Sequence, residues 1–367
     1  MSPPMALPDH TIPVADLDAL VTGIFAAAGC TPAEAACVSR HLISANLTGH
    51  DSHGVIRTPR YVGWLEEGQV FAGRTIAVER DSGTHAVLDG RRGLGQSIGE
   101  QAVDLGIARA RDAGLAVVAL RNSGHIGRIG GWGERAAEAG LVSIHFVNVG
   151  LGEIVAPFGG VDRRFGTNPI CVAAPQPDGP PLLLDLATSL VAEGKVLVAS
   201  NGGKPVPPGS LIRPDGTHTA DPEALYGPLT GTQLRDPGHG TGALRAFGDH
   251  KGSGIAFMCE ILAGCLCGSP TAGPIPGDKR GGIVNGMLSI YLDPGHFGAA
   301  HFAAAARDYA LHVKGSRPET PGGEVLVPGE KEARTRQARL RDGIPLQGGT
   351  WAALQATAAK LGVGLPG

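Results

Sequence analysis

The stretch HAVLDGRRGLGQSIGEQAVDLGIARARDAGLAVVALR, residues 85–121, decides the fold class of this protein. A short apolar run at 85–90 and another at 115–121 each predict a strand. Between them, residues 97–114 carry apolar side chains at helical spacing and predict a helix. A strand, a helix and a second strand in succession indicate an α/β domain.

The same alternation continues on both sides of this stretch. Residues 133–140 predict a helix and residues 141–148 a strand. Further strands are predicted at 169–174, 181–187 and 287–293, and a buried helix at 251–266. We therefore expect an α/β fold with a central mixed sheet and flanking helices.

Both ends of the chain have helical patterns instead. Helices are predicted at 15–29, 31–49, 58–68, 331–343 and 350–362. Thr31 and Glu34 form a capping-box pattern before the second of these helices, and Thr350 is the expected N-cap of the last. We expect residues 1–75 and 296–367 to form a helical unit for substrate binding and dimer contacts. Residues 76–295 would form an α/β cofactor-binding domain, with a polar, glycine-rich loop insertion at 227–244.

Composition excludes several classes of protein. The 367 residues are 42% hydrophobic and 18% charged, with a net charge of −3. A nucleic-acid binder needs a concentrated basic surface, which this balance does not favour. The longest apolar run, in 251–266, is interrupted by Glu260 and is too short to span a membrane.

The six cysteines are expected to be reduced. They form no CxxC pair, and three of them lie in the apolar run around 251–267, which indicates small buried side chains rather than a metal site. Reduced thiols favour a cytoplasmic protein. The first ten residues, MSPPMALPDH, have neither the charged nor the apolar part of a signal peptide.

The glycine-rich turn GLGQSIG, residues 93–99, is similar to the fingerprint of a dinucleotide-binding Rossmann fold. Its spacing is GxGxxxG rather than GxGxxG. The next strand also ends in Arg121 and Asn122, where NAD sites have an acidic residue for the ribose. A structural strand-to-helix turn is the preferred interpretation.

The stretch HDSHGVIRTPRY, residues 50–61, has the side chains for acid–base chemistry on an organic anion. His53, Arg57 and Tyr61 are spaced four apart, although Pro59 favours a bend with a helix starting at Thr58. An imidazole exchanges protons near neutral pH, and a guanidinium binds a carboxylate with two hydrogen bonds. The trio therefore suits a 2-oxo or 2-hydroxy acid.

A metal site is the alternative interpretation of the same stretch. His50, Asp51 and His53 could be ligands, and His125 could join them in a metal-dependent hydrolase. The spacing lacks the glutamate of the HExxH zinc motif. A further alternative is a sensor that binds a nicotinamide nucleotide without turnover.

Four more polar clusters follow predicted strands or open predicted helices, where α/β proteins bind ligands. His125 lies in RNSGHIG, between two glycines that let a ligand approach the backbone. Phosphate or ribose contacts are suggested by LDLATS and by DHKGSG. The residues of interest in these clusters are His125, Thr167, Asn168, Asp185, His250 and Lys251.

Taken in order, the motifs resemble the malate/L-lactate dehydrogenase-type oxidoreductases. They are GHDSHGVIRTPRYVGWLEEG, RNSGHIG, FGTNP, LDLATS, DHKGSG and VPGEKEAR. The resemblance covers about residues 15–340. This non-Rossmann family also includes ureidoglycolate, sulfolactate and diketogulonate enzymes and cyclic imino-acid reductases. The resemblance implies a homodimer that uses NAD or NADP and acts on a small carboxylate substrate.

The resemblance also implies roles for individual residues. His53 and His125 both match proposed proton donors, and the sequence does not choose between them. Substrate contacts are implied for Arg57 and Tyr61, and we add Thr167 and Asn168. Cofactor contacts are implied for Asn148, Asp185, Leu186, Ala187, His250, Lys251, Gly329 and Glu330. Asp249 departs from the glycine common at its position and leaves the choice of NAD or NADP open.

Overall fold

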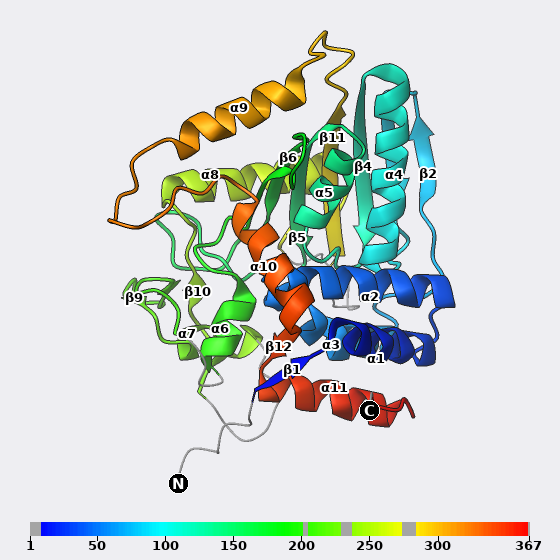
Figure 1. The fold of residues 1–367 in the computed structure, drawn as a ribbon. Helices are drawn as coiled ribbons and strands as arrows, with labels where there is room; N and C mark the ends of the chain where they lie inside the picture. The colour runs from blue at the N-terminus through cyan, green and yellow to red at the C-terminus, as the bar shows by residue number, and fades with distance from the viewer. Residues whose placement is uncertain (1–8, 201–204, 229–236, 274–283, 366–367) are drawn as a thin grey trace. The chain divides into compact units, whose positions relative to one another are not determined.

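The computed structural model describes residues 9–200, 205–228, 237–273 and 284–365 (Figure 1). Its first helices, α1 (Val14–Ala27) and α2 (Pro32–Leu47), match the prediction. Thr31 caps α2 by accepting a hydrogen bond from the Glu34 backbone N–H at 3.2 Å. The Glu34 carboxylate turns to the backbone N–H of Gly73 at 2.7 Å, so the capping box is only half formed.

The central sheet is mixed and has the strand order β2-β3-β4-β11-β5-β6-β7. β2 pairs with β3 in antiparallel orientation, whereas β3 and β4 are parallel. The strands are β2 (Ala77–Asp81), β3 (His85–Asp89), β4 (Leu115–Ser123), β5 (Val142–Gly150), β6 (Ile170–Ala174), β7 (Leu182–Leu186) and β11 (Val284–Leu292). The parallel pair β3–β4 requires a crossover, which α4 (Gly95–Ala113) supplies. The predicted α/β class with a central mixed sheet and flanking helices is confirmed.

The shorter elements that follow β7 form a small core of their own. They are α6 (Glu193–Ser200), β8 (Leu211–Ile212), β9 (His218–Thr219), α7 (Glu223–Tyr226), a 3-10 turn (Pro237–His239) and β10 (Ala243–Leu244). The strands pair in the order β10-β8-β9, and Val196, Leu225 and Leu244 are buried beside them. Residues 229–236 of the predicted loop insertion lie outside the described residues.

The predicted buried helix is real but is buried on one face only. α8 (His250–Cys259) continues as a π-helix (Glu260–Leu266). Ala256 is fully buried, whereas Phe257 is 54% exposed and Leu266 is 66% exposed. Uniform hydrophobicity suggested burial all round, and this expectation was wrong because the exposed side chains lie on the opposite face.

The C-terminal segment returns to the N-terminal helices. It contains α9 (Phe302–Lys314), α10 (Glu330–Asp342), β12 (Ile344–Leu346) and α11 (Gly348–Lys360). β1 (His10–Ile12) pairs with β12 in antiparallel register, and Arg339 of α10 binds Asp51 through two hydrogen bonds of 2.6 and 3.0 Å. Thr350 is not the N-cap that was predicted, because α11 begins at Gly348 after Gln347.

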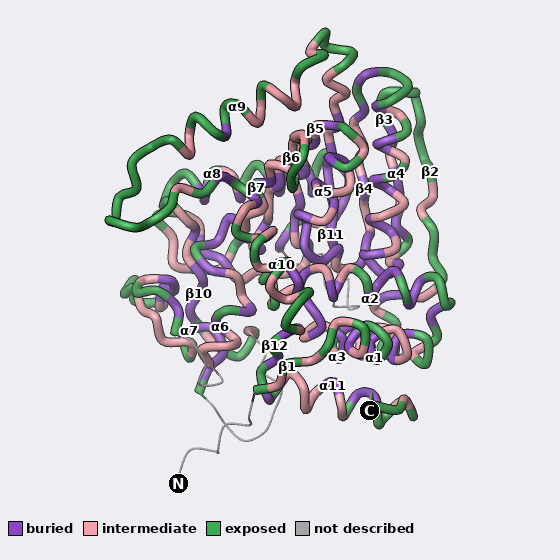
Figure 2. The backbone as a smooth tube through the Cα atoms, viewed as in Figure 1, coloured by how far each residue is buried: buried purple, intermediate pink, exposed green. Residues whose placement is uncertain are grey.

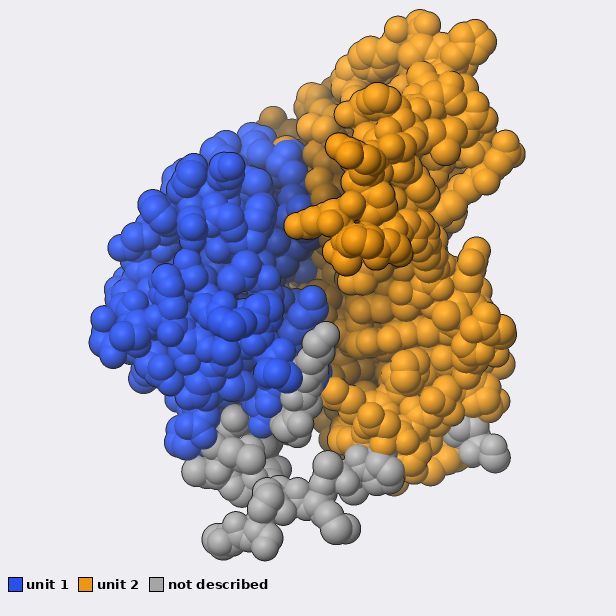
Figure 3. Space-filling view, turned by 60° about the vertical axis from the view of Figure 1, so that its left-hand side comes forward, with its two compact units in different colours: residues 1–6, 146–170, 186–287 blue, residues 7–145, 171–185, 288–367 orange. Residues whose placement is uncertain are grey.

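Two compact units make up the chain (Figure 3). One contains residues 146–170 and 186–287, and the other contains 7–145, 171–185 and 288–367. The N-terminal helices thus belong to the same compact unit as β2, β3 and β4. Compactness does not show which segments fold independently, so the predicted boundaries at 76 and 295 stay a prediction.

Burial follows the sheet and the helices next to it (Figure 2). β11 is buried along most of its length and β2 is largely exposed, whereas α9 is partly exposed with Ala310 as its buried residue. Among the described residues, no helix is both long enough and apolar enough to cross a membrane.

Candidate active site

The segment at residues 50–61 is two successive 3-10 turns followed by a helix. The turns span Asp51–His53 and Val55–Arg57, and α3 (Thr58–Glu66) begins directly after them. The predicted bend with a helix start at Thr58 is therefore confirmed. It places His53 and Arg57 at the ends of consecutive turns rather than on one helical face.

Asn46, near the end of α2, organises these turns. Its side-chain amide donates to Asp51 Oδ1 at 2.6 Å, and its Oδ1 accepts from the Val55 backbone N–H at 2.8 Å. A Cβ at Gly54 would lie 2.1 Å from Asn46 Oδ1. Gly54 is therefore needed for Asn46 to reach through the bend and hold His53 in place.

Two rings from the stretch 50–61 meet one ring from a distant part of the sequence. The imidazoles of His53 and His125 stack with 5.7 Å between ring centroids and 13° between ring planes. The Tyr61 hydroxyl lies 2.5 Å from Nδ1 of His125. His125 comes from the loop after β4 and Tyr61 from α3, so the sheet and the N-terminal helices both contribute.

Arg57 supplies positive charge to this cluster. Its Nε donates to the Ser52 carbonyl at 2.6 Å, and the side chain is half-buried. The guanidinium charge also acts on the pKa values of His53, His125 and Tyr61. The two histidines and the guanidinium thus lie on the same side of this unit.

Both imidazoles are neutral at physiological pH. Burial lowers the pKa of His125 to about 3, and the Arg57 charge adds to the effect. Burial also holds the pKa of His53 well below its ordinary value, with further contributions from His125 and Arg57. The guanidinium can bind an anion, and a neutral imidazole beside it has one nitrogen that can accept a proton.

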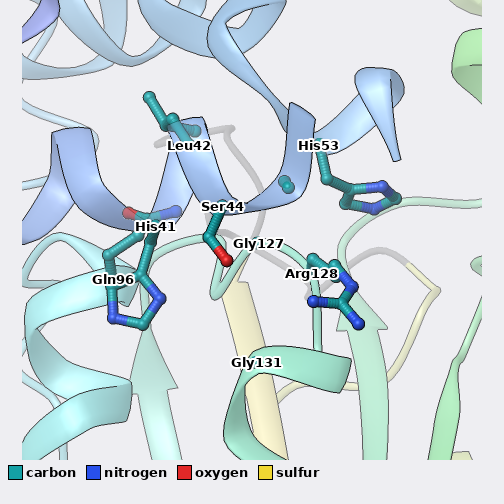
Figure 4. Close-up of a pocket in the computed structure, with 9 residues that line it drawn as sticks. His41, Leu42, Ser44, His53, Gln96, Gly127, Arg128 and Gly131 are labelled. Atoms are coloured by element: carbon teal, nitrogen blue, oxygen red, sulfur yellow. The ribbon is translucent and has the colours of Figure 1, made fainter. Parts of the chain in front are cut away.

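A small cavity that opens to solvent lies beside His53 (Figure 4). α2 and α4 contribute to its wall, and the loop after β4 completes it. Its lining residues are His41, Leu42, Ser44, Ala45, His53, Gln96, Gly127, Arg128 and Gly131.

Asp185 lies in a buried ionic cluster near the cavity. Its Oδ2 accepts a hydrogen bond from the Gly130 backbone N–H at 3.0 Å and lies 3.3 Å from Nε of Arg128. Arg128 also binds both oxygens of Glu134, at 2.9 and 3.0 Å. His50 also belongs to this cluster, with its Nε2 3.9 Å from Oδ2 of Asp185. The carboxylate of Asp185 therefore connects the start of α5 (Gly130–Glu138) to the end of β7.

Asn148 and Asn168 serve a buried hydrogen-bond network. The amides of both donate to the carboxylate of Glu260, at 3.1 and 2.7 Å. Oδ1 of Asn148 accepts from Gly286 N–H and Oδ1 of Asn168 from Val149 N–H, each at 3.0 Å. Both side chains are fully buried, so their polar groups already have partners within the protein. Thr167 is half-buried and accepts the hydroxyl of Thr188 with its carbonyl at 2.9 Å.

The start of α8 presents two exposed side chains with N–H groups, His250 and Lys251. The amides there are less open than the sequence suggested, since the Lys251 N–H donates to Gly248 O and the Gly252 N–H to Phe247 O, each at 3.1 Å. Asp249, the departure from the family pattern, is paired with Arg245 at 2.8 Å. The local negative charge is therefore offset.

The remaining predicted cofactor residues lie at the ends of β7 and α10. Leu186 and Ala187 are half-buried where β7 ends. Gly329 has φ of 95°, and a Cβ there would lie 2.7 Å from the Pro181 carbonyl. Glu330 accepts from the Val327 backbone N–H at 3.1 Å and pairs with Lys314.

The metal interpretation finds no support at residues 50–53. Asp51 is held by Arg339 and Asn46, and His50 faces Asp185. Within the described part of the chain, the residues close enough to share a metal are Cys37, His41 and Glu100. Glu100 there already pairs with Arg40 and lies 3.8 Å from Arg135. Two guanidinium groups disfavour a cation at that carboxylate.

Gln96 and Arg128 were not predicted as site residues. Gln96 opens α4 within the glycine-rich turn, and Arg128 lies three residues after His125. The sequence around Gln96 indicated a structural turn, whereas Arg128 lies beside the polar cluster of His125 but was given no role of its own. Their side chains became meaningful only when packing brought them to the cavity.

Comparison with known proteins gives a consistent result. A profile of malate/L-lactate dehydrogenase matches residues 12–355. Hydroxycarboxylate dehydrogenase B of Escherichia coli (strain K12) is 42% identical over 356 residues, which are 96% of this chain and 95% of that protein. L-lactate dehydrogenase of Cupriavidus necator is 36% identical over 90% of this chain and 91% of its own.

Other similar proteins have different names. A Δ1-pyrroline-2-carboxylate/Δ1-piperideine-2-carboxylate reductase of Pseudomonas putida is 33% identical over 94% of this chain and 96% of its own. Among solved structures, a putative malate/lactate dehydrogenase from E. coli superposes with a TM-score of 0.88 at 41% identity, covering 97% of this chain and 96% of that one.

Proposed function

The chain belongs to the malate/L-lactate dehydrogenase family, and from this premise we propose that it moves a hydride between a nicotinamide cofactor and C2 of a small 2-hydroxy or 2-oxo acid. The observation that carries the proposal is the cluster of His53, His125 and Arg57 beside the cavity. It combines two neutral imidazoles with a guanidinium, which are the groups that a 2-hydroxy acid requires.

The protein's own residues supply orientation and proton transfer. Arg57 binds the substrate carboxylate, which fixes C2 and its hydroxyl relative to the histidines. In oxidation, a neutral histidine accepts the hydroxyl proton while the C2–H bond breaks. In reduction, the same proton returns to the 2-oxygen. When bound, the cofactor supplies or accepts the hydride.

The predicted cofactor contacts remain part of this proposal. The exposed side chains of His250 and Lys251 can donate hydrogen bonds to the phosphates of a nucleotide. The Arg245–Asp249 ion pair offsets the negative charge that would repel a phosphate there. Asp185, Asn148 and the neighbouring residues would contribute mainly through backbone groups, because their side chains already have partners. Gly329, at the start of α10, would offer backbone without a side chain.

A cyclic 2-imino-acid reductase is the second candidate. The reductase of Pseudomonas putida is 33% identical, and its named substrates also carry a carboxylate next to the carbon that receives hydride. The same guanidinium and histidines could serve either substrate class. We favour the hydroxy acid because the relative with 42% identity is a hydroxycarboxylate dehydrogenase.

The deciding experiment measures NADH and NADPH absorbance with a panel of 2-oxo acids, 2-hydroxy acids and the cyclic imines. We expect turnover of at least one 2-oxo acid, and its loss in His53→Asn. Turnover of cyclic imines alone would favour the second candidate. A folded protein that binds neither nucleotide and turns over neither class would contradict the proposal.

We also propose a cytoplasmic homodimer. The described structure leaves all six cysteines free, which suits a reducing compartment. The exposed apolar residues Phe257, Met258 and Leu266 on one face of α8 and its π-helical extension suit a protein contact. Light scattering after size exclusion should give twice the mass of the 37.4 kDa chain.

A further inference from the structure

The glycine-rich turn at residues 93–99 packs against the loop that carries His125. A Cβ at Gly95 would lie 2.2 Å from the His125 carbonyl oxygen, and one at Gly99 would lie 2.6 Å from the Trp132 ring. These glycines permit close contact between α4 and the loop, and this contact accounts for them without a pyrophosphate. This contact places Gln96 beside Tyr61 and His125.

Gln96 is buried and binds both members of the tyrosine–histidine pair. Its Nε2 lies 3.2 Å from the Tyr61 hydroxyl and 3.3 Å from the His125 backbone carbonyl. The carbonyl oxygen accepts hydrogen bonds and never donates them, so the NH2 end of the amide must face it. Gln96 therefore donates to the Tyr61 oxygen.

The direction of the next hydrogen bond follows from this one. The Tyr61 oxygen accepts a hydrogen bond from Gln96, and Nδ1 of His125, 2.5 Å away, is the acceptor within reach of its own O–H. A buried O–H without an acceptor is costly, so the O–H is directed to Nδ1. Nδ1 is then an acceptor, and a neutral imidazole with an acceptor at Nδ1 has its proton on Nε2.

We propose that Gln96 is a positioning residue that acts through Tyr61 to hold His125 as the Nε2–H tautomer. The predicted effect of Gln96 on turnover rests on the proposed function. His125 would then offer an N–H to the 2-oxygen of the substrate and stabilise the charge that develops there. It has no free nitrogen for the substrate's hydroxyl proton, so His53 carries that proton.

The first test reads the tautomer directly and needs neither substrate nor cofactor. Long-range ¹H–¹⁵N spectra of the ¹⁵N-labelled full chain should show His125 as the Nε2–H form, assigned by its loss in His125→Gln. In Gln96→Met, which keeps the length of the side chain but cannot donate, we expect the Nδ1–H form to appear. A wild-type protein with the Nδ1–H form, or an unchanged tautomer in Gln96→Met, overturns the proposal.

The second test measures turnover beside a matched control. Gln101 lies on the same helix and donates to the Ser97 carbonyl at 3.0 Å, away from Tyr61. We expect Gln96→Met to lower kcat roughly 10- to 100-fold, somewhat less than the loss of a direct oxyanion donor, with cofactor KM unchanged. Gln101→Met should keep wild-type kcat. Equal losses in the two variants would mean that Gln96 has only a structural role.

The two tests separate this inference from the proposed function. Absence of turnover in the wild type would count against the proposed function, while the tautomer spectra still decide the role of Gln96. Should Gln96→Met fail to fold, Tyr61→Phe removes the O–H that donates to Nδ1 of His125, and we expect the Nδ1–H form to appear in that variant. Retention of the pure Nε2–H form in Tyr61→Phe would contradict the proposal.

Discussion

At the scale of single residues, the environment of each side chain sets its chemistry more than its type does. His53 and His125 have the same imidazole, but only His125 has Nδ1 bound to Tyr61. His53 has the Ser52 hydroxyl 3.1 Å from its Nδ1, a partner that either donates or accepts. One imidazole therefore has a fixed tautomer and the other has an adjustable one.

Arg57→Lys tests the carboxylate contact. Lysine keeps the charge but offers a point donor in place of a planar fork. We expect kcat/KM for the acid to fall roughly 10- to 100-fold, the loss of a charge-assisted hydrogen bond of about 1.5–3 kcal/mol. Steady-state kinetics measure this, with Arg60→Lys as the control because Arg60 is exposed on α3. Equal kinetics in Arg57→Lys and the wild type would exclude the two-bond contact.

At the scale of elements, the approach of α4 to the loop after β4 depends on Gly95. Because Gly95 has no side chain, the first turn of α4 can pack directly on the His125 carbonyl. The same close packing recurs at Gly106, where a Cβ would lie 2.2 Å from the Tyr291 ring. The helix therefore has little freedom to shift along the sheet.

Gly95→Ala should destabilise the protein by about 1–3 kcal/mol, because the methyl group meets backbone that cannot rotate away. Gly254→Ala on α8 is the contrasting change. Nothing lies within 4 Å of a Cβ at Gly254, so alanine there should stabilise by about 0.5–1 kcal/mol. Urea unfolding of both variants checks the two signs. Destabilisation by Gly254→Ala as large as by Gly95→Ala would contradict the packing argument.

At the scale of the whole molecule, buried neutral histidines make stability depend on pH. Burial lowers the pKa of His125 and of His145 to about 3 in the folded protein, from an ordinary value of 6.5. A pKa that is lower in the folded state gives stability that is complete above 6.5 and is lost as the pH falls toward 3.

We expect the free energy of unfolding to fall by about 2 kcal/mol for each of these two histidines between pH 6.5 and pH 5. This window avoids Glu100, whose pKa of about 2 acts at lower pH. Urea titrations at several pH values measure the slope. His145→Gln, which can still bond to Ser143 and Ser289, should give a shallower slope. An unchanged slope in that variant would mean that His145 is not neutral in the folded state.

Local patterns in the sequence determined the elements and the class of fold. Helical and strand periodicity predicted β3, α4 and β4 because each depends on neighbours within a few residues. The bend at Thr58 was also predictable, since Pro59 restricts its own and the preceding backbone. Thr350 was predicted as the N-cap of α11, but the N-cap is Gln347. Both residues follow the short strand β12, so the local sequence does not distinguish them.

Only the tertiary structure decided which polar groups are free for chemistry. The sequence marked Tyr61, Asn148 and Asn168 as contacts for ligands, but whether a side chain has spare hydrogen bonds depends on partners far away in the chain. The carboxylate of Glu260 takes both amides, and Gln96 with His125 takes the tyrosine hydroxyl. Residue types and their order fixed what this protein can do, whereas packing of distant segments fixed the hydrogen-bond directions by which it does so.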